Sequence, residues 1–431
     1  MPPVHTGAPT TPGASAAQSP ESATDAGRLS PGRPGYRRMT FALFAAGLAT
    51  FALLYSTQAL LPALSTSFGV TAGQASWTVS AATGALALFV LPLSALSERF
   101  GRTRMMTVSL VLAVALGLLV PFAPNVEWLV ALRAVQGAAL AGVPASAMAY
   151  LAEEVRPKAL VAAIGLFVAG NSIGGMSGRM VTGWAAEMWG WRAGLATVGA
   201  LALLCTVAFL VLLPRARFFT PASLRPRAVG RTVAGHLRDP LLLRLYGVGA
   251  LFMTVFGAVY TVIGYRLVDE FSLGQGVIGS VFLVYLVGTV SSAAAGQLVA
   301  RTGRRGALYL AVATTALGLL LSLGDALVAI VAGLVLITAG FFAGHAVASS
   351  AVSRTAKTGR AQASALYQSA YYLGSSAGGT LGALAYHAGG WPATVAFALV
   401  AVLGVVSITL CGTRAARAER AATARALLGA R

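Results

Sequence analysis

The sequence predicts an all-α polytopic membrane protein whose twelve transmembrane helices form two pseudo-symmetric halves of six. The 431 residues are 57% hydrophobic and only 10% charged, which is more apolar side chain than a soluble domain can cover with polar surface. Apolar segments near the ~20 residues that a membrane helix needs recur along the chain. Motifs of the first half also return in the second half, which is the mark of an internal repeat.

The chain begins with a polar head, residues 1–38, which is rich in Pro, Ser, Thr and Gly. It has no apolar stretch that could form the core of a signal peptide, so we expect a disordered cytoplasmic tail. The apolar segments that follow are 39–64, 74–97, 105–122, 127–152, 159–187, 193–213, 245–268, 275–299, 306–323, 326–353, 362–387 and 393–411.

One gap between these segments is long. Residues 214–244 form a basic linker that separates a first half, residues 39–213, from a second half, residues 245–411. Residues 412–431 form a basic tail. The linker and this tail are both expected to be cytoplasmic.

The basic residues select one orientation in the membrane. Lys and Arg number 31 against 12 Asp and Glu, and 27 of the 31 fall in the head, the linker, the tail and alternate short loops. The positive-inside rule then places both termini in the cytoplasm, and the expected location is a bacterial cytoplasmic (inner) membrane. Since the positive charge is spread over loops rather than gathered on one polar module, a nucleic-acid partner is not expected.

Two stretches of the first half recur in the second. The charged loop "LSERFGRTRMM" (96–106) is echoed by "GQLVARTGRRG" (296–306), where an offset of 202 lays Arg99 on Arg301, Gly101 on Gly303 and Arg102 on Arg304. In the same way "GNSIGG" (170–175) falls on "GSSAGG" (374–379) at an offset of 204. These echoes predict two parallel repeats of six helices.

The motifs resemble those of the major facilitator superfamily. The superfamily loop G-x-x-x-D-R-x-G-R-R is matched by Glu98, Arg99, Gly101 and Arg102, with departures at its first and last positions. The fourth-helix pattern R-x-x-Q-G is met by Arg133, Gln136 and Gly137.

The fifth-helix antiporter pattern G-x-x-x-G-P-x-x-G-G is met only in part, because Asn171 stands in place of its proline and Leu166 in place of its first glycine. The stretches "YSTQALLP", "GNSIGGMSGR" and "ALYQSAYYLGSSAGGTLG" resemble bacterial inner-membrane exporters of the drug:proton antiporter branch called arabinose-efflux-permease-like.

The resemblance implies an alternating-access secondary transporter that exports a small organic solute, drug-like or sugar-like, in exchange for protons. An uncoupled facilitator or uniporter is the alternative. A polytopic membrane enzyme fits less well, because no intramembrane carboxylate pair or His-rich metal set is present. We expect a monomer in the lipid bilayer that has no cofactor, no metal and no catalytic residue. The cytoplasmic gate that the resemblance implies consists of Glu98, Arg99, Gly101, Arg102, Arg301, Gly303 and Arg304.

Polar side chains inside the apolar segments predict the substrate path. They lie on segments 39–64, 127–152, 159–187 and 362–387, and the candidates are Tyr55, Gln58, Arg133, Gln136, Asn171, Arg179, Tyr367 and Tyr371. An arginine in mid-helix costs about 2.5–3.5 kcal/mol on insertion scales, so Arg133 and Arg179 must face a cavity, water or a partner. Hydrogen bonds to backbone carbonyls are the structural alternative for both.

A proton-driven exporter needs a group that gains and loses a proton, and the first apolar segment contains no acid. His345 is the titratable side chain placed in mid-membrane, and the ordinary pKa of histidine is about 6.5. We therefore expect His345 to carry or gate the proton and Arg133 to tune it. The alternative is a histidine packed between Phe341, Phe342 and alanines.

Overall fold

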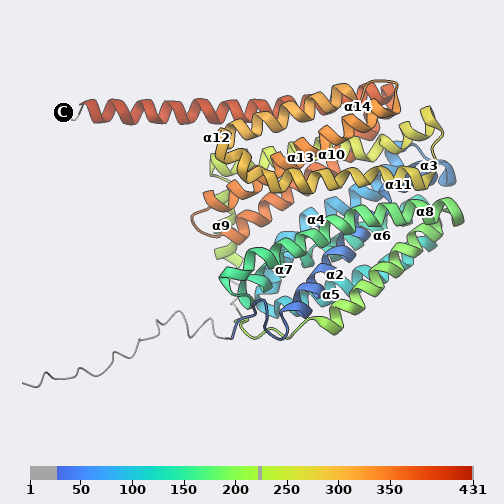
Figure 1. Ribbon diagram of the computed structural model, residues 1–431, viewed down its shortest axis with the longest axis horizontal. Coiled ribbons are helices and arrows are strands. Elements are labelled where there is room, and N and C mark those ends of the chain that lie inside the picture. The colour runs from blue at the N-terminus through green and yellow to red at the C-terminus, as the bar shows by residue number, and fades with distance from the viewer. Residues whose placement is uncertain (1–26, 222–225, 430–431) are drawn as a thin grey trace, which may run out of the picture.

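The computed structural model describes residues 27–221 and 226–429. Within these residues the chain is helical, apart from loops and one isolated bridge between Leu29 and Val155. Figure 1 shows the first half, coloured blue to green, lying alongside the second half, coloured yellow to red.

The helices of the first half are α2 (Tyr36–Leu54), η1 (Gln58–Leu60), α3 (Leu61–Phe68), α4 (Ala72–Phe100), α5 (Arg102–Leu119), η2 (Val120–Phe122), α6 (Val126–Leu140), α7 (Gly142–Glu154) and α8 (Pro157–Leu212). Those that follow are α9 (Pro226–His236), α10 (Pro240–Phe271), α11 (Gln275–Val281), η3 (Phe282–Val284), α12 (Tyr285–Leu321), α13 (Leu327–Thr355) and α14 (Arg360–Gly429).

The predicted twelve membrane segments are confirmed. Nine helical stretches of the described chain are long and apolar enough to cross a membrane. Three of them are pairs of helices that meet at non-helical glycines, which are Gly190 in α8, Gly303 in α12 and Gly389 with Gly390 in α14. Each of these three stretches therefore supplies two membrane segments.

Glycines hold the helices of each half in close contact. Side chains added at Gly170, Gly174 and Gly178 of α8 would collide with the α2 backbone at Phe44, Leu48 and Ala52. In the second half, Gly374, Gly378 and Gly382 of α14 meet Ala250, Thr254 and Ala258 of α10 in the same way. Any side chain at these positions would push the two backbones apart. Each stripe of glycines, spaced four residues apart on one helix face, therefore serves helix packing. The repeated stripe also shows that the two halves share one architecture.

The two ends of the bundle differ in what they carry. We call the end with α9, the start of α2 and the start of α10 the linker end, and the opposite end, with α3 and the start of α11, the far end (Figure 1). Both charged loops lie at the linker end, where Gly101 (φ 101°) ends α4 and Gly303 (φ 72°) interrupts α12. A positive φ favours glycine, which explains why both copies of the loop keep it.

The segments just before the first helix and at the end of the last helix are both described in part. Residues 1–26 lie outside those described, but Leu29 donates its backbone N–H to the carbonyl of Glu154 (2.8 Å) and accepts one from Arg156 (3.0 Å). These backbone bonds fix the chain just before α2 to the end of α7. At the other terminus α14 continues as a helix to Gly429 and runs out past the bundle (Figure 1).

Candidate functional site

Hydrogen bonds between the two halves are concentrated towards the far end. Within the described residues they join Gln58 to Thr261 (3.4 Å), Ser65 to Tyr265 (2.6 Å), Tyr265 to the carbonyl of Leu61 (3.0 Å), Trp184 to Ser280 (3.0 Å), Gly276 to Glu187 (2.6 Å) and Ser376 to the carbonyl of Ser80 (2.8 Å). All six lie in the parts of α2–α4, α8, α10, α11 and α14 nearer the far end. At the linker end of the described chain, no hydrogen bond joins one half to the other.

Glu187 makes a contact that depends on charge. Helix α11 begins at Gln275, and its N-cap residue, Gly274, has no side chain to cap it. The carboxylate of Glu187, on α8 in the other half, accepts the backbone N–H of Gly276 at 2.6 Å. A negative charge at a helix N-terminus is stabilising because it meets free N–H groups and the positive end of the helix dipole. One half thus caps a helix of the other.

Arg179 lies beside Gln58, whose bond to Thr261 is one of the hydrogen bonds between the halves. Its side chain is almost fully buried, with 2% exposed. The Nε and Nη2 atoms both donate to the amide oxygen of Gln58 (2.8 and 2.6 Å), and Nη1 donates to the carbonyl of Gly175. The amide nitrogen of Gln58 in turn donates to Thr261 in the second half.

Three aromatic rings surround the guanidinium of Arg179. Its Cζ lies 4.2 Å from the ring centroid of Tyr55, 4.6 Å from that of Phe282 and 5.0 Å from that of Tyr285. Tyr55 belongs to the first half, and the other two rings belong to the second. Aromatic faces attract a cation at these distances. In the described chain, no carboxylate lies within 4.0 Å of this guanidinium.

Arg133 donates hydrogen bonds to backbone carbonyls, which is the structural role that the sequence left open for it. Helix α2 ends at Leu54, so its last carbonyls lack partners within the helix. Arg133, which is fully buried, donates to the carbonyls of Leu53 (2.7 Å), Leu54 and Thr78 (3.1 Å). It therefore stabilises the break in the first membrane segment, and the residues just after that break, including Tyr55, reach Arg179.

Gln136 and Gly137 complete the same motif. Gln136 accepts a hydrogen bond from Arg133 and donates to the carbonyl of Ala113 at 2.9 Å. A side chain at Gly137 would collide with the backbone of Ala82 in α4. The R-x-x-Q-G pattern thus ties α2, α4, α5 and α6 together beside the site.

A column of aromatic rings in the second half connects the Arg179 site to His345. Ring centroids are 5.2 Å apart for Tyr285 and Phe256, 4.0 Å for Phe256 and Phe341, and 6.1 Å for Phe341 and His345. The His345 ring also lies 4.7 Å from that of Tyr371. We call these five residues the aromatic column.

One of the two ring nitrogens of His345 forms a hydrogen bond. Its Nδ1 atom lies 2.9 Å from the hydroxyl of Tyr367, with which it shares a hydrogen bond. No described residue forms a hydrogen bond with Nε2.

The structure brings some of the predicted site residues together and separates others. Tyr55, Gln58 and Arg179 meet at the interface between the halves, whereas Tyr367, Tyr371 and His345 gather within the second half. Asn171 packs against Gly47 of α2, and its buried side-chain oxygen has no partner among the described residues.

Arg133 and His345 are not in contact. The hydrogen-bond partners of Arg133 all belong to the first half, and those of His345 belong to the second. In this conformation, no contact between the two side chains could let Arg133 act directly on proton binding by His345.

The charged loop after α4 is bonded within its own half. Arg102 forms an ion pair with Glu153 at the end of α7 (3.0 Å) and donates to Ser97 (2.7 Å). Glu98, by contrast, has no hydrogen-bond or ion-pair partner among the described residues. The acid that meets Arg102 is therefore Glu153, and not the neighbouring Glu98.

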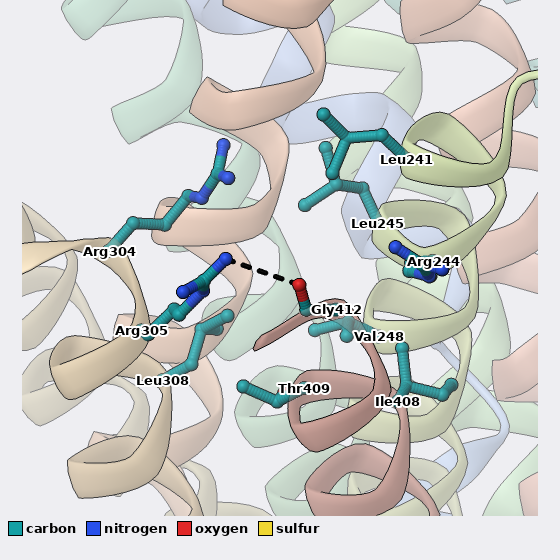
Figure 2. Close-up of a pocket in the computed structure, with 10 residues that line it drawn as sticks. All are labelled: Leu241, Arg244, Leu245, Val248, Arg304, Arg305, Leu308, Ile408, Thr409 and Gly412. Atoms are coloured by element: carbon teal, nitrogen blue, oxygen red, sulfur yellow. Dashed lines mark hydrogen bonds between the residues drawn. The ribbon is translucent and has the colours of Figure 1, made fainter. Parts of the chain in front are cut away.

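The second copy of the loop lines a pocket within the second half. Figure 2 shows Arg304 and Arg305 of α12 facing Leu241, Arg244 and Leu245 of α10, with Arg305 donating to the carbonyl of Gly412 at 3.2 Å. Arg301 is exposed. Because residues of the linker, the second half and the start of the tail line this pocket, and none of the first half does, it does not lie between the halves.

The sequence reasoning missed Phe282, Tyr285 and Phe256. The first two stand three residues apart, on one face of a helix, but an aromatic pair within an apolar segment is also what packing produces. Within the described residues, no group of three or more His, Cys, Asp or Glu is close enough to hold a metal ion.

Comparisons with known proteins agree with this architecture. The sequence profile of the Major Facilitator Superfamily matches residues 39–357 and 245–427. The chain is 41% identical to the inner membrane transport protein YnfM of Escherichia coli (strain K12), over 89% of this chain and 91% of that one. It is 39% identical to the uncharacterized MFS-type transporter YybF of Bacillus subtilis (strain 168), over 88% and 94%.

Solved structures share the fold. One is the inward-facing, occupied crystal structure of a bacterial homologue of the human lysosomal transporter Spinster. It has a TM-score of 0.69 and 14% identity, covering 89% of this chain and 97% of that one.

Proposed function

The chain belongs to the major facilitator superfamily and is a membrane transporter rather than an enzyme, and we propose that it exports a small organic solute in exchange for protons. The solute binds between the halves beside Arg179. Tyr55 and Gln58 complete the site from the first half, and Phe282 and Tyr285 complete it from the second.

The observation that supports this proposal is the distribution of the hydrogen bonds between the two halves. They run from Glu187 at the far end to Gln58 and Thr261 beside Arg179, and no hydrogen bond joins the halves at the linker end of the described chain. These bonds close the site towards the far end, and we propose that solute reaches it from the linker end. Rocking of the halves about this point would reverse the access, as in alternating-access transporters built from repeats.

The direction of transport follows from the topology. We assign the linker end to the cytoplasm, because 27 of the 31 basic residues lie in segments that connect or end there. Both termini are then cytoplasmic, in the inner membrane of a bacterium, and the conformation described here accepts solute from the cytoplasm. We further propose that the monomer is the working unit, since the site is complete within one chain.

The proton is assigned to His345. It shares the aromatic column with the solute site, and its Nε2 atom is free of hydrogen bonds to described residues. Histidine is the side chain that most readily changes charge near neutral pH. Arg133 contributes indirectly, by holding the helix break that positions Tyr55.

Everted membrane vesicles test the coupling. Respiration acidifies their interior, and a pH-sensitive dye reports proton release when a solute enters in exchange. The solutes are naphthalene-2-sulfonate (anion), naphthalene-2-sulfonamide (neutral), tetraphenylphosphonium (cation) and L-arabinose. We expect release with at least one of them, in vesicles that contain the chain and not in vesicles without it. Solute entry without any proton release would instead establish an uncoupled facilitator.

His345→Gln tests the proton assignment in the same vesicles. As pH is stepped from about 5.5 to about 8, around the ordinary pKa of histidine, the variant should lose the pH dependence of the parent. Tyr367→Phe keeps the ring and removes only the hydrogen bond to Nδ1, so it serves as the matched control. If His345→Gln keeps both the rate and the pH profile, the proton is carried elsewhere.

A further inference from the structure

Arg179 combines two features that neither of the other buried arginines, Arg133 and Arg266, shows together: it has no carboxylate partner among the described residues, and two of its N–H groups are unused. Arg266 is 2% exposed and pairs with Glu270 (2.7 Å), while also donating to the carbonyls of Ser322 and Gly324. Arg133 also lacks a carboxylate partner among the described residues, but it makes four hydrogen bonds, to the carbonyls of Leu53, Leu54 and Thr78 and to Gln136. Arg179 has no carboxylate among the described residues, and two of its three hydrogen bonds go to one oxygen atom of Gln58.

Arg179 also retains hydrogen-bonding capacity. A guanidinium carries five N–H groups, and the three bonds to Gln58 and Gly175 leave two of them for another acceptor. Burial of a charge without a counterion is unfavourable. The three rings around it offset part of that cost, but a ring face accepts no strong hydrogen bond.

Tyr285 supplies a second unused polar group at the same place. Its ring lies 5.0 Å from the Cζ of Arg179, its side chain is 8% exposed, and its buried hydroxyl has no partner within the described chain. A buried hydroxyl without a partner is uncommon in folded proteins. A ligand oxygen that met Arg179 could also accept the hydrogen bond of this phenol.

We propose that the transported solute is an organic anion, whose carboxylate or sulfonate binds Arg179 and whose aromatic body stacks on the aromatic column. This inference rests on the proposed transport function and specifies its substrate class. A planar anion suits the site because a guanidinium binds two oxygens of one acid group side by side. The column begins at Tyr285, beside the guanidinium, and continues through Phe256 and Phe341, so the surroundings of the site are aromatic and suit the rest of such a solute.

The charge of the solute has a consequence for the driving force. Export of an anion moves negative charge out of a cell whose interior is negative, so the membrane potential favours it. Entry of a proton moves charge in the same sense. Exchange of one anion for one proton is therefore electrogenic, and a potassium diffusion potential imposed with valinomycin should accelerate it.

Binding to the purified full-length chain tests the site directly. Naphthalene-2-sulfonate and naphthalene-2-sulfonamide have nearly the same shape and differ in charge, and quenching of tryptophan fluorescence reports their binding. We expect saturable binding of the sulfonate to the parent and to Arg179→Lys, and binding at least roughly tenfold weaker to Arg179→Gln, as loss of a charge-assisted bond predicts. The sulfonamide should bind all three proteins equally weakly.

Arg192→Gln is the matched control. Arg192 lies over the ring of Trp191 at 4.2 Å but is exposed, so its removal deletes a cation–π pair outside the site. It should leave sulfonate binding unchanged. Size-exclusion profiles establish that each variant is folded. If Arg179→Gln does not fold, the preference of the parent for the sulfonate over the neutral sulfonamide still tests the site.

The result separates the substrate class from the transport function. Equal sulfonate affinity in the parent and Arg179→Gln, or no saturable sulfonate binding to the folded parent, would overturn the anion site. Proton release in everted vesicles with tetraphenylphosphonium or arabinose alone would also overturn it, while leaving the exporter intact.

Discussion

The far end and the linker end of the bundle are held by different kinds of contact. At the far end, side chains of one half bond to the other half, as Glu187 does to Gly276 and Tyr265 does to Ser65. At the linker end, bonds stay within one half or join it to the linker, as Arg102 does with Glu153. We propose that the halves part at the far end when these few hydrogen bonds exchange partners.

Packing within each half is of a third kind. The glycine stripes of α8 and α14 meet the backbones of α2 and α10 with no room for a side chain. Such contacts do not slide without a clash. The contrast supports the proposal that each half moves as one body and that the polar contacts of the two ends set which conformation is populated.

The largest effect on stability is expected at the linker end. Glu154 is 2% exposed and accepts the backbone N–H groups of Arg217 (2.7 Å) and Phe218 (2.9 Å), which fastens the linker to α7. Glu154→Ala should lower the free energy of unfolding by about 2–3 kcal/mol, because two bonds to a charged group are lost. Denaturant unfolding in detergent micelles measures this.

The same substitution should leave the far end unchanged. Hydrogen–deuterium exchange over residues 274–281 should match the parent. Faster exchange there would mean that the two ends are not independent, and the comparison between them would fail.

A smaller effect is expected from Glu187→Gln at the far end. The neutral amide replaces a charge-assisted hydrogen bond to Gly276 with a weaker one, a loss of about 1 kcal/mol. The balance between conformations should shift roughly fivefold towards opening of the far end. Exchange over residues 274–281 should accelerate by the same factor.

Glu270→Gln is the control for this experiment. Glu270 lies at the same end but pairs with Arg266 of its own half (2.7 Å). It should not affect exchange over residues 274–281. If both variants accelerate exchange equally, the contact between the halves has no special part in closing the far end.

The smallest stability effect is expected for Arg102→Gln. The pair with Glu153 is partly exposed, at 12% and 26% for the two side chains, and such pairs contribute less than about 1 kcal/mol. Transport should nevertheless fall, because we propose that this loop, with Glu98, latches the linker end when the far end opens. Arg104→Gln, an exposed change in the same loop, is the control. Equal transport in Arg102→Gln and the parent would leave the loop a topological anchor only.

The sequence allowed prediction of the twelve segments, the repeat and part of the site. Apolar length defines a membrane helix locally, so segments such as 39–64 needed no knowledge of their neighbours. Arg179 was identifiable because a charge inside such a segment is costly. The partners of Arg133 were not identifiable, since carbonyls freed by the break after Leu54 carry no signal in residue type.

The three rings around the Arg179 guanidinium could not be predicted from the sequence for a different reason. Tyr55 and Tyr285 are far apart in the chain and meet only because α8 packs on α11 and η3 across the interface between the halves. Packing between two repeats depends on the conformation of the transporter. The spacing of residues within one repeat therefore cannot predict which rings of the two repeats come together.

The central claim is that the halves separate at the far end during transport, and a disulfide between them tests it most directly. A Cβ on Gly84 of α4 would lie 3.6 Å from the Cβ of Ser376 of α14, which is within the range for a disulfide. The experiment uses Gly84→Cys with Ser376→Cys in a background where Cys205 and Cys411 are replaced by serine, and each single cysteine is a control. We predict that oxidation abolishes transport by the pair, that reduction restores it, and that the single variants respond to neither. Undiminished transport by the fully oxidised pair would contradict the account, because the halves would then not part at this contact.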